Sequence, residues 1–401
     1  MTSTTRRFDE AGPMLETTED ITEETTPSSR RRRATAAALR ERRSILLVVP
    51  VVMLLIVGLG AMLSASSVVS IRETGDPLFY MKRQVLWVGL GLAAFVITTR
   101  IPYRFYQRVA VPIYVLAVAG LAATLTFGVV RGGARRWIEV GPITVQPSEF
   151  AKLATVIVLA AILARKGPLL QKFGHFAVPV VTVVGSVSLL LLLQPDFGTA
   201  LLIGGAAFSV MIASTAPIGY LAGVATIGGL LAVGGALGMD YRRARITGFL
   251  DPFADPLDGG LQAVQSLVAL GTGSWFGVGL GASRARWSFL PNAHTDFIFA
   301  IIGEEIGFVG ASLVLVLFAA FGFLGIRVAL KAPDMFGRLL AVGIVGWLSL
   351  QALVNIGGVV GALPITGVPL PFLSSGGNAM LVNLAAVGIL VNIARAGATR
   401  S

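Results

Sequence analysis

The sequence predicts an all-α protein that crosses a membrane about ten times. The 401 residues are 55% hydrophobic and only 13% charged, whereas a soluble domain averages about 45–50% apolar and about 25% charged residues. From Ser44 onward, apolar runs recur near the length of ~20 residues that a spanning helix requires. These two observations exclude a soluble globular domain and indicate a polytopic membrane protein.

The transmembrane domain is predicted over residues 44–396. Its spans are predicted at residues 45–63, 84–99, 109–128, 151–164, 177–194, 200–213, 218–238, 297–326, 339–361 and 379–396. The shortest of these runs are expected to extend into their flanking residues. Residues 1–43 are polar and lack apolar periodicity, which predicts a disordered cytoplasmic tail, and residues 397–401 are predicted to form a second, short cytoplasmic tail.

The placement of lysine and arginine predicts that both termini lie in the cytoplasm. Segments on the same side as the N-terminus hold more of these residues than the outer segments do, as the positive-inside rule requires. The basic residues on the outer side nevertheless form clusters, at Arg131, Arg135, Arg136, Arg242, Arg243, Arg245, Arg284 and Arg286. Topology disfavours them there, so we infer that the outer face handles an anionic ligand.

Two long outer loops are predicted, at about residues 129–150 and 239–296, the second between helices 7 and 8. The second loop contains a weakly apolar, glycine-rich stretch at residues 261–281, which includes Gln262 and Gln265. Irregular backbone is tolerated at membrane depth only where it is buried in protein or lines a cavity. This stretch is therefore predicted to be a re-entrant or interfacial segment.

Composition also excludes several kinds of site. The chain has no cysteine, which excludes disulfides and thiolate catalysis, and its only histidines, His175 and His294, argue against a multi-histidine metal site. The net charge of +11 is densest at Arg30–Arg33, ahead of the first span. A basic run in that place is typical of an anchor on anionic lipid. No aromatic platform accompanies it, so no nucleic-acid partner is predicted.

Ionisable residues at membrane depth are costly and are candidates for function. Here they fall at the predicted outer ends of spans, at Lys82, Arg83, Glu149, Lys152, Asp196, Asp296, Glu304 and Glu305. One hypothesis is that they line a single outward-facing cavity. The alternative is that they form interfacial salt bridges that fix helix ends.

Five sequence blocks resemble a known family. They are Gly133-Ala-Arg-Arg-Trp-Ile138, Gln146-Pro-Ser-Glu149, Gln194-Pro-Asp-Phe-Gly-Thr199, the stretch from Leu290 to Gly310 that contains Ala293-His-Thr-Asp-Phe297, and Leu370-Pro-Phe-Leu-Ser-Ser-Gly-Gly377. In this order and spacing the blocks closely resemble the signature of the FtsW/RodA (SEDS) family over about residues 45–395. The chain departs from the usual pattern at Asn292, Ser375 and Ser274, where relatives usually carry Glu, Tyr and Gly.

Within the family, the chain is more similar to the FtsW branch than to the RodA branch. The segments that favour this interpretation are Ser64-Ala-Ser-Ser67, Phe249-Leu-Asp-Pro-Phe253, Gln265-Ser-Leu267 and Gly277-Val-Gly-Leu-Gly281, together with the long charged tail. The resemblance implies an inverting peptidoglycan glycosyltransferase that polymerises lipid II at the outer face of the cytoplasmic membrane during cell division. A RodA-like polymerase of elongation remains the alternative branch.

The resemblance also assigns the candidate catalytic residue. Asp296 matches the family's catalytic aspartate and is expected to act as general base, taking the proton of the attacking sugar hydroxyl. Its structural alternative is an N-cap of the eighth span, because Asp is a favoured cap. His294 is expected to be an orienting neighbour rather than the base.

Cations are needed to hold the departing diphosphate. The candidates are Arg135, Arg136 and Lys152, with Arg83 and Arg243 behind them, and their alternative role is to bind lipid headgroups. Trp137 matches a family position required for activity, or else it is an interfacial belt tryptophan. Glu149 and Asp196 are expected to orient the cations. Ser374 is expected to shape a tight turn beside the tenth span.

Two further classes of function stay open: a lipid II flippase or transporter, and a non-catalytic scaffold of the division machinery. A transporter places its site near the midplane, whereas these candidates crowd the outer ends of the spans. The resemblance implies a class B penicillin-binding transpeptidase (FtsI-like) and FtsQ, FtsL and FtsB-type proteins as partners, at the septum of the inner membrane. It leaves open whether a divalent cation, Mg²⁺ or Mn²⁺, bridges the diphosphate.

Overall fold

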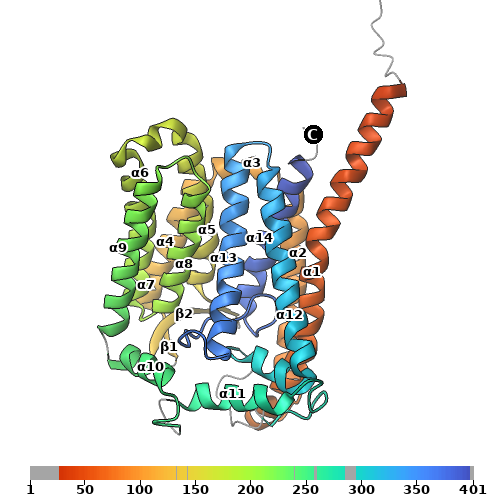
Figure 1. The fold of residues 1–401 in the computed structure, drawn as a ribbon, viewed down its shortest axis with the longest axis vertical. Helices are drawn as coiled ribbons and strands as arrows, with labels where there is room; N and C mark the ends of the chain where they lie inside the picture. The colour runs from red at the N-terminus through yellow and green to blue at the C-terminus, as the bar shows by residue number, and fades with distance from the viewer. Residues whose placement is uncertain are drawn as a thin grey trace, which may run out of the picture.

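The computed structural model describes residues 27–131, 133–141, 143–238, 240–256, 260–284 and 295–397. Over these residues the protein is a bundle of long helices with one small sheet at one end (Figure 1). Its long helical segments are α1 (Pro27–Thr74), α2 (Phe79–Arg100), α4 (Ala110–Phe127), α5 (Pro147–Lys166), α6 (Phe173–Val180) continued by a π-helical turn (Val181–Gly185) and α7 (Ser186–Leu193), α8 (Phe197–Ile212), α9 (Ile218–Leu237), α12 (Ile298–Leu330), α13 (Met335–Val359) and α14 (Gly377–Gly397).

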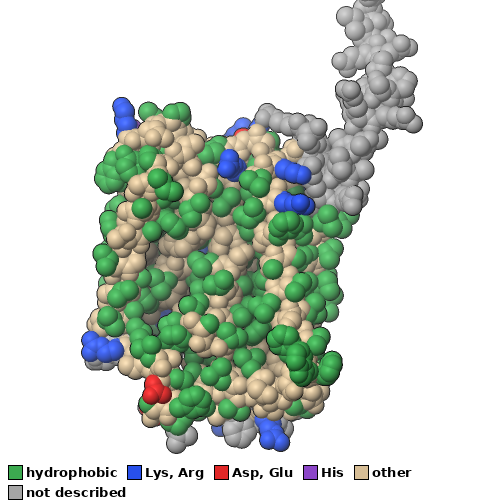
Figure 2. All heavy atoms as spheres, in the orientation of Figure 1, with side chains coloured by type: hydrophobic (Ala, Val, Ile, Leu, Met, Phe, Trp, Pro, Cys, Tyr) green, Lys and Arg blue, Asp and Glu red, His purple; other side chains and the backbone are tan. Residues whose placement is uncertain are grey.

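Nine of the ten predicted spans are confirmed, in the predicted order. Within the described residues, nine helical segments are long and apolar enough to cross a membrane. The predicted span at residues 200–213 corresponds to α8, which has 16 residues and is shorter than the others. Charged side chains gather at the two ends of the face shown in Figure 2, and hydrophobic side chains cover the surface between them, as expected for a bundle surrounded by lipid.

The start of α1 differs from the prediction. The sequence predicts a disordered tail at residues 1–43; residues 1–26 of it lie outside the described part of the chain, and α1 begins at Pro27. Proline is favoured in the first turn of a helix, and the Ala, Arg, Leu and Glu residues that follow are strong helix formers, so the span continues backward as helix. The start of α1 and the end of α14 lie at the same end of the bundle (Figure 1).

Helices α5, α12, α13 and α14 carry most of the core, and α13 and α14 are the most enclosed of the candidate spans. By contrast, α9 is almost wholly exposed and packs mainly along α8 and α10 (Asp240–Leu250), with Tyr220 also stacked on Phe176 of α6. The bundle therefore has a tightly packed half and a thinner half. Two short elements, α3 (Tyr103–Arg108) and a 3₁₀ turn (Gly167–Gln171), connect spans at the end that holds the termini.

A small antiparallel sheet, which the sequence analysis leaves as a loop, lies at the opposite end. Its strands are β1 (Val129–Arg131), β2 (Ala134–Val140) and β3 (Ile143–Val145), in the order β1-β2-β3. Gly133 and Gly141 make the two tight turns with φ of 77° and 58°, which a residue with a Cβ rarely adopts. The strands are too short and too charged to stand out as a periodic pattern.

The long outer loop folds as predicted for an interfacial segment. Helix α11 (Leu261–Gly273) lies across the end of the bundle instead of along its axis (Figure 1). The residues after α11 pack against a kink in α12 at Gly307, where φ is 73° and ψ is −164°. There, Val278 N–H donates to the Glu304 carbonyl at 2.9 Å, and Phe308 N–H donates to the Ser274 carbonyl at 2.8 Å. These bonds satisfy backbone groups that the broken helix leaves open.

Candidate functional site

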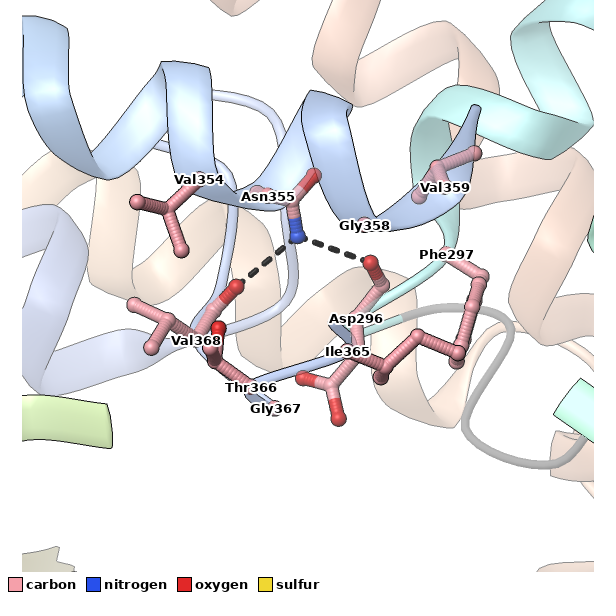
Figure 3. Close-up of a pocket in the computed structure, with 10 residues that line it drawn as sticks. All are labelled: Asp296, Phe297, Val354, Asn355, Gly358, Val359, Ile365, Thr366, Gly367 and Val368. Atoms are coloured by element: carbon pink, nitrogen blue, oxygen red, sulfur yellow. Dashed lines mark hydrogen bonds between the residues drawn. The ribbon is translucent and has the colours of Figure 1, made fainter. Parts of the chain in front are cut away.

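Asp296 lies just before α12, which begins at the end of the bundle opposite the termini, and it lines a small, partly open hollow. The opposite wall is the chain after α13, where Gly367 adopts a φ of 71°. The residues that line the hollow are Asp296, Phe297, Val354, Asn355, Gly358, Val359, Ile365, Thr366, Gly367 and Val368. Figure 3 shows the Asp296 carboxylate pointing away from Asn355, beside Thr366 and Gly367.

The environment tunes the Asp296 carboxyl toward a base. Burial raises its pKa to about 6, while the positive charges of Arg245 and Arg136 and a hydrogen bond from Thr295 oppose that rise. A carboxylate with a pKa near 6 is mostly ionised at pH 7, and it holds a transferred proton more readily than an exposed aspartate does. The alternative role as an N-cap is not observed, because the cap position of α12 is Phe297.

Arg136 is brought to this site by β2. Because side chains alternate along a strand, Arg136 points to one face of the sheet while Arg135 and Trp137 point to the other. Arg136 is half-buried, and its Nη1 lies 3.6 Å from Asp196 Oδ1. Its Nη2 also donates to the Pro195 carbonyl. The predicted role of Asp196 in orienting a cation thus has a structural counterpart.

Sequence reasoning named Arg245 among the outer basic residues but missed its place beside Asp296. On α10, Arg243 and Arg245 are two positions apart and therefore lie on nearly opposite faces of the helix. Arg243 is exposed and donates to Leu237 O at 3.1 Å, whereas Arg245 is half-buried and donates to Ile365 O at 3.2 Å. A Cβ built at Gly367 would lie 3.7 Å from Asp296 Oδ2 and 3.8 Å from Arg245 Nη1, so both groups border the same glycine. Predicting residues 240–250 as a helix would have shown that Arg243 and Arg245 lie on different faces, so that only one of them can point toward Asp296.

Lys152 lies deeper in the bundle and is fully enclosed. It pairs with Glu149 and donates to Gln351 Oε1 at 3.1 Å, with the Trp347 ring centroid 5.4 Å from its Nζ. In this arrangement its ammonium is not presented to the hollow, and binding a diphosphate would require the pair to open. Glu149 does orient a cation, but that cation is the buried lysine.

The remaining candidates lie apart from the hollow or outside the described residues. Arg83 is exposed near the start of α2, and Arg135 is exposed on β2, where it donates to Leu125 O at 3.4 Å. Trp137 is half-buried on the face of β2 that it shares with Arg135. His294 lies outside the residues that the structure describes.

Ser374 is buried and forms the predicted turn. Its Oγ accepts the Leu370 N–H at 2.8 Å, and its own N–H donates to Leu370 O at 3.1 Å. Among the described residues, no group of three or more His, Asp or Glu side chains is arranged to hold a metal ion. We therefore assign no described residue to a divalent cation.

Asn355, on α13, is a residue that sequence reasoning missed. Its side-chain N–H₂ donates at 2.8 Å both to the main-chain carbonyl of Asp296 and to that of Val368 (Figure 3). One turn earlier on the same face, Gln351 donates to Pro369 O at 2.8 Å. Both amides lie within the long apolar sequence of α13, and no motif or residue spacing connects them with Asp296.

Comparison with known proteins decides the family. The family model described as "Cell cycle protein", which covers FtsW, RodA and SpoVE, matches residues 45–398. The chain belongs to the FtsW/RodA/SpoVE family. It is 41% identical to stage V sporulation protein E of Bacillus subtilis over 341 residues, which are 84% of this chain and 93% of that protein. It is also 41% identical to the probable peptidoglycan glycosyltransferase FtsW of Thioalkalivibrio sulfidiphilus, over 85% of this chain and 87% of that protein.

Solved structures of the family share the fold. A peptidoglycan synthase complex that coordinates polymerization and crosslinking contains a chain that is similar with a TM-score of 0.71 and 31% identity, covering 87% of this chain and 96% of that one. The rod shape determining protein RodA of Thermus thermophilus is similar with a TM-score of 0.65 and 29% identity, covering 87% and 95%. The FtsW/RodA/SpoVE fold therefore extends over the whole bundle described above.

Proposed function

We propose that this chain is a peptidoglycan glycosyltransferase that polymerises lipid II at the outer face of the cytoplasmic membrane, with Asp296 as general base. The observation that carries the proposal is the position of the Asp296 carboxylate, in a partly open hollow and under the influence of two guanidinium groups. The names of the relatives as peptidoglycan glycosyltransferases support the same reaction.

The chemistry is a single displacement at the anomeric carbon of the donor sugar. The 4-hydroxyl oxygen of the acceptor attacks this carbon and gives its proton to Asp296. The bond between the anomeric carbon and the phosphate oxygen breaks, and its electrons leave with the polyprenyl diphosphate. Because attack and departure occur on opposite faces of the sugar, the configuration inverts.

Two arginines suit the leaving group. Arg136 and Arg245 are the cations whose charge acts on Asp296, so a diphosphate held by them would lie close to the base. Guanidinium groups bind phosphate oxygens through two parallel hydrogen bonds, and they stabilise the negative charge that develops as the bond breaks. In the free protein Asp196 keeps Arg136 in place.

The flippase alternative suits this geometry less well. A transporter requires a substrate site near the midplane with access from both sides, whereas Asp296, α10 and the sheet lie at one end of the bundle (Figure 1). The similar peptidoglycan synthase complex coordinates polymerization with crosslinking, and this supports a class B penicillin-binding transpeptidase as partner. Assignment to the septum, with FtsQ, FtsL and FtsB-type proteins, rests on the FtsW-like segments.

The test is polymerisation of lipid II by the purified chain together with its transpeptidase partner, with glycan strands separated on a gel. Asp296→Asn should abolish strands while expression and partner binding stay at wild-type levels. Asp76→Asn is the matched control, because Asp76 is an exposed carboxylate paired with Lys82. Wild-type polymer from Asp296→Asn would overturn the mechanism, and lipid II movement without polymer from the wild type would favour the flippase.

A further inference from the structure

Two stretches of chain meet at the hollow without being neighbours in sequence. One holds Asp296 before α12, and the other is the segment after α13 that contains Gly367 and Val368. Each is an irregular stretch of backbone, and the hollow exists only while the two keep their distance. What fixes that distance determines where the Asp296 carboxylate points.

Asn355 is the side chain that joins them. Its Nδ2 lies 2.8 Å from the Asp296 carbonyl oxygen and 2.8 Å from the Val368 carbonyl oxygen. Asn355 is 5% exposed, so neither carbonyl has bulk water as a ready substitute partner. A buried carbonyl that loses its donor keeps the cost of its lost hydration.

The chemistry of the contact requires an amide and fixes its orientation. Both partners are carbonyl oxygens, which only accept, so the group between them must donate twice. The NH₂ of asparagine does so, and its own oxygen is left facing the other way without a partner. Aspartate, which has the same shape, would place acceptors against acceptors.

The support extends along α13. Gln351, four residues earlier, donates to Pro369 O at 2.8 Å and accepts from Trp347 Nε1 at 2.9 Å. Two amides on one helix face therefore hold consecutive carbonyls, those of Val368 and Pro369. Of the two, only Asn355 also binds the main-chain carbonyl of Asp296.

We propose that Asn355 is a positioning residue of the glycosyltransferase, which holds the main chain of Asp296 against the segment after α13 so that the carboxylate faces the acceptor hydroxyl. The inference rests on the proposed function, because it assumes that Asp296 is the base. Asn355 acts on the reaction only through Asp296 and the shape of the hollow.

The expected effect is on turnover. A misplacement of about 1 Å can cost on the order of 10²-fold in rate, so Asn355→Leu should lower kcat by about 10- to 100-fold while KM for lipid II stays within about threefold. Without the tie, the carboxylate should reach water more easily, which lowers its desolvation. The acid limb of the pH–rate profile should then move to lower pH.

The matched control is Asn392 on α14. Its Oδ1 accepts the Tyr103 N–H at 2.9 Å and its Nδ2 donates to Thr99 O at 2.9 Å, so it also makes two side-chain to backbone bonds, but at the end that holds the termini. Asn392→Leu should lower the thermal unfolding temperature to a similar extent and leave kcat and the pH profile unchanged. Asn355→Leu keeps the number and branching of the side-chain heavy atoms but is bulkier, so Asn355→Ala serves as the second variant if the leucine does not fit.

The experiment measures kcat, KM, the pH profile and the unfolding temperature for the wild type, Asp296→Asn and these variants, each with the transpeptidase partner. Polymerisation that persists in Asp296→Asn would remove the proposed role of Asp296 as general base, on which the inference rests. If Asp296→Asn is inactive while the Asn355 variants match Asn392→Leu in kcat and pH profile, Asn355 is merely structural and the inference is wrong. A selective loss of kcat with a shifted acid limb supports it.

Discussion

Lys152 Nζ lies 2.8 Å from Glu149 Oε2 in the first turns of α5, and both side chains are almost completely enclosed. The pair faces α13, where Gln351 Oε1 accepts a hydrogen bond from the same ammonium at 3.1 Å. A buried ion pair contributes little net stability when intact, because both charges lost their hydration. Its importance appears when one partner is removed.

We expect Glu149→Gln to destabilise the protein by about 3–5 kcal/mol, because it leaves the Lys152 charge buried without a counter-charge. The double variant Glu149→Gln/Lys152→Met should recover part of this loss. Thermal unfolding in detergent or nanodiscs measures both. Glu73→Gln is the control, since Glu73 is exposed, and an equal effect at the two positions would contradict the expectation.

The second prediction concerns pH. Because the pKa of Asp296 is raised by burial to about 6 and the base must be ionised, the rate should fall about tenfold per pH unit below about pH 6. Arg136 opposes that rise, so Arg136→Met should move the acid limb to higher pH and also lower kcat. Arg135→Met, on the other face of β2, should leave the limb in place. Polymerisation rates between pH 5 and pH 8 measure the shift, and identical limbs for the two variants would rule out the electrostatic role.

The third prediction concerns the kink in α12. A Cβ at Gly307 would lie 2.4 Å from the Gly277 nitrogen, and its φ of 73° is unfavourable for residues with a side chain. Gly307→Ala should therefore lower stability by more than about 2 kcal/mol and loosen the segment after α11. Gly223→Ala is the control, because nothing lies within 4 Å of a Cβ there. Proteolysis of the 273–284 segment and the unfolding temperature report the effect, and equal values for the two variants would show that the kink relaxes freely.

The fold was predictable because it follows from apolar run length. The runs around α12 and α13 are long and nearly free of charge, so their existence does not depend on tertiary contacts. The small sheet was not predictable, because its strands obtain their order from two glycine turns and from packing at the end of the bundle. The backward extension of α1 to Pro27 follows from the helix propensity of its residues. Disorder was predicted there because only the polar composition of the tail was considered.

The site residues that belong to a sequence motif were predictable, whereas those placed by tertiary packing were not. Asp296 and Arg136 stand in family blocks and do lie within electrostatic reach of each other. Arg243 was chosen from the sequence as a site candidate instead of Arg245. The choice between them depends on which face of α10 packs against the bundle, and the sequence does not determine that face. Asn355 has no sequence signal, since its role arises from two carbonyls that are distant along the chain.

The last prediction concerns the end that holds the termini. Asp334 caps α13 through the Gly337 N–H at 2.8 Å, and it accepts from Tyr103 Oη at 2.6 Å and Arg104 Nε at 3.0 Å. Burial alone would raise the pKa of Asp334, but these hydrogen bonds and the Arg104 charge outweigh it and lower the pKa below its ordinary value.

Asp334→Ala should therefore cost on the order of 2 kcal/mol of stability, for a lost cap and a tyrosine O–H that loses its acceptor. A carboxyl with a lowered pKa contributes its stability fully above its unfolded pKa of ~3.9 and loses it only as the pH falls through the folded value. The difference in unfolding temperature between wild type and Asp334→Ala should consequently be constant from pH 5 to pH 8. Polymerase activity per folded molecule should be unchanged, because Asp334 lies at the far end of the bundle from Asp296. A difference that grows with pH within that window would mean that another group titrates in this cluster.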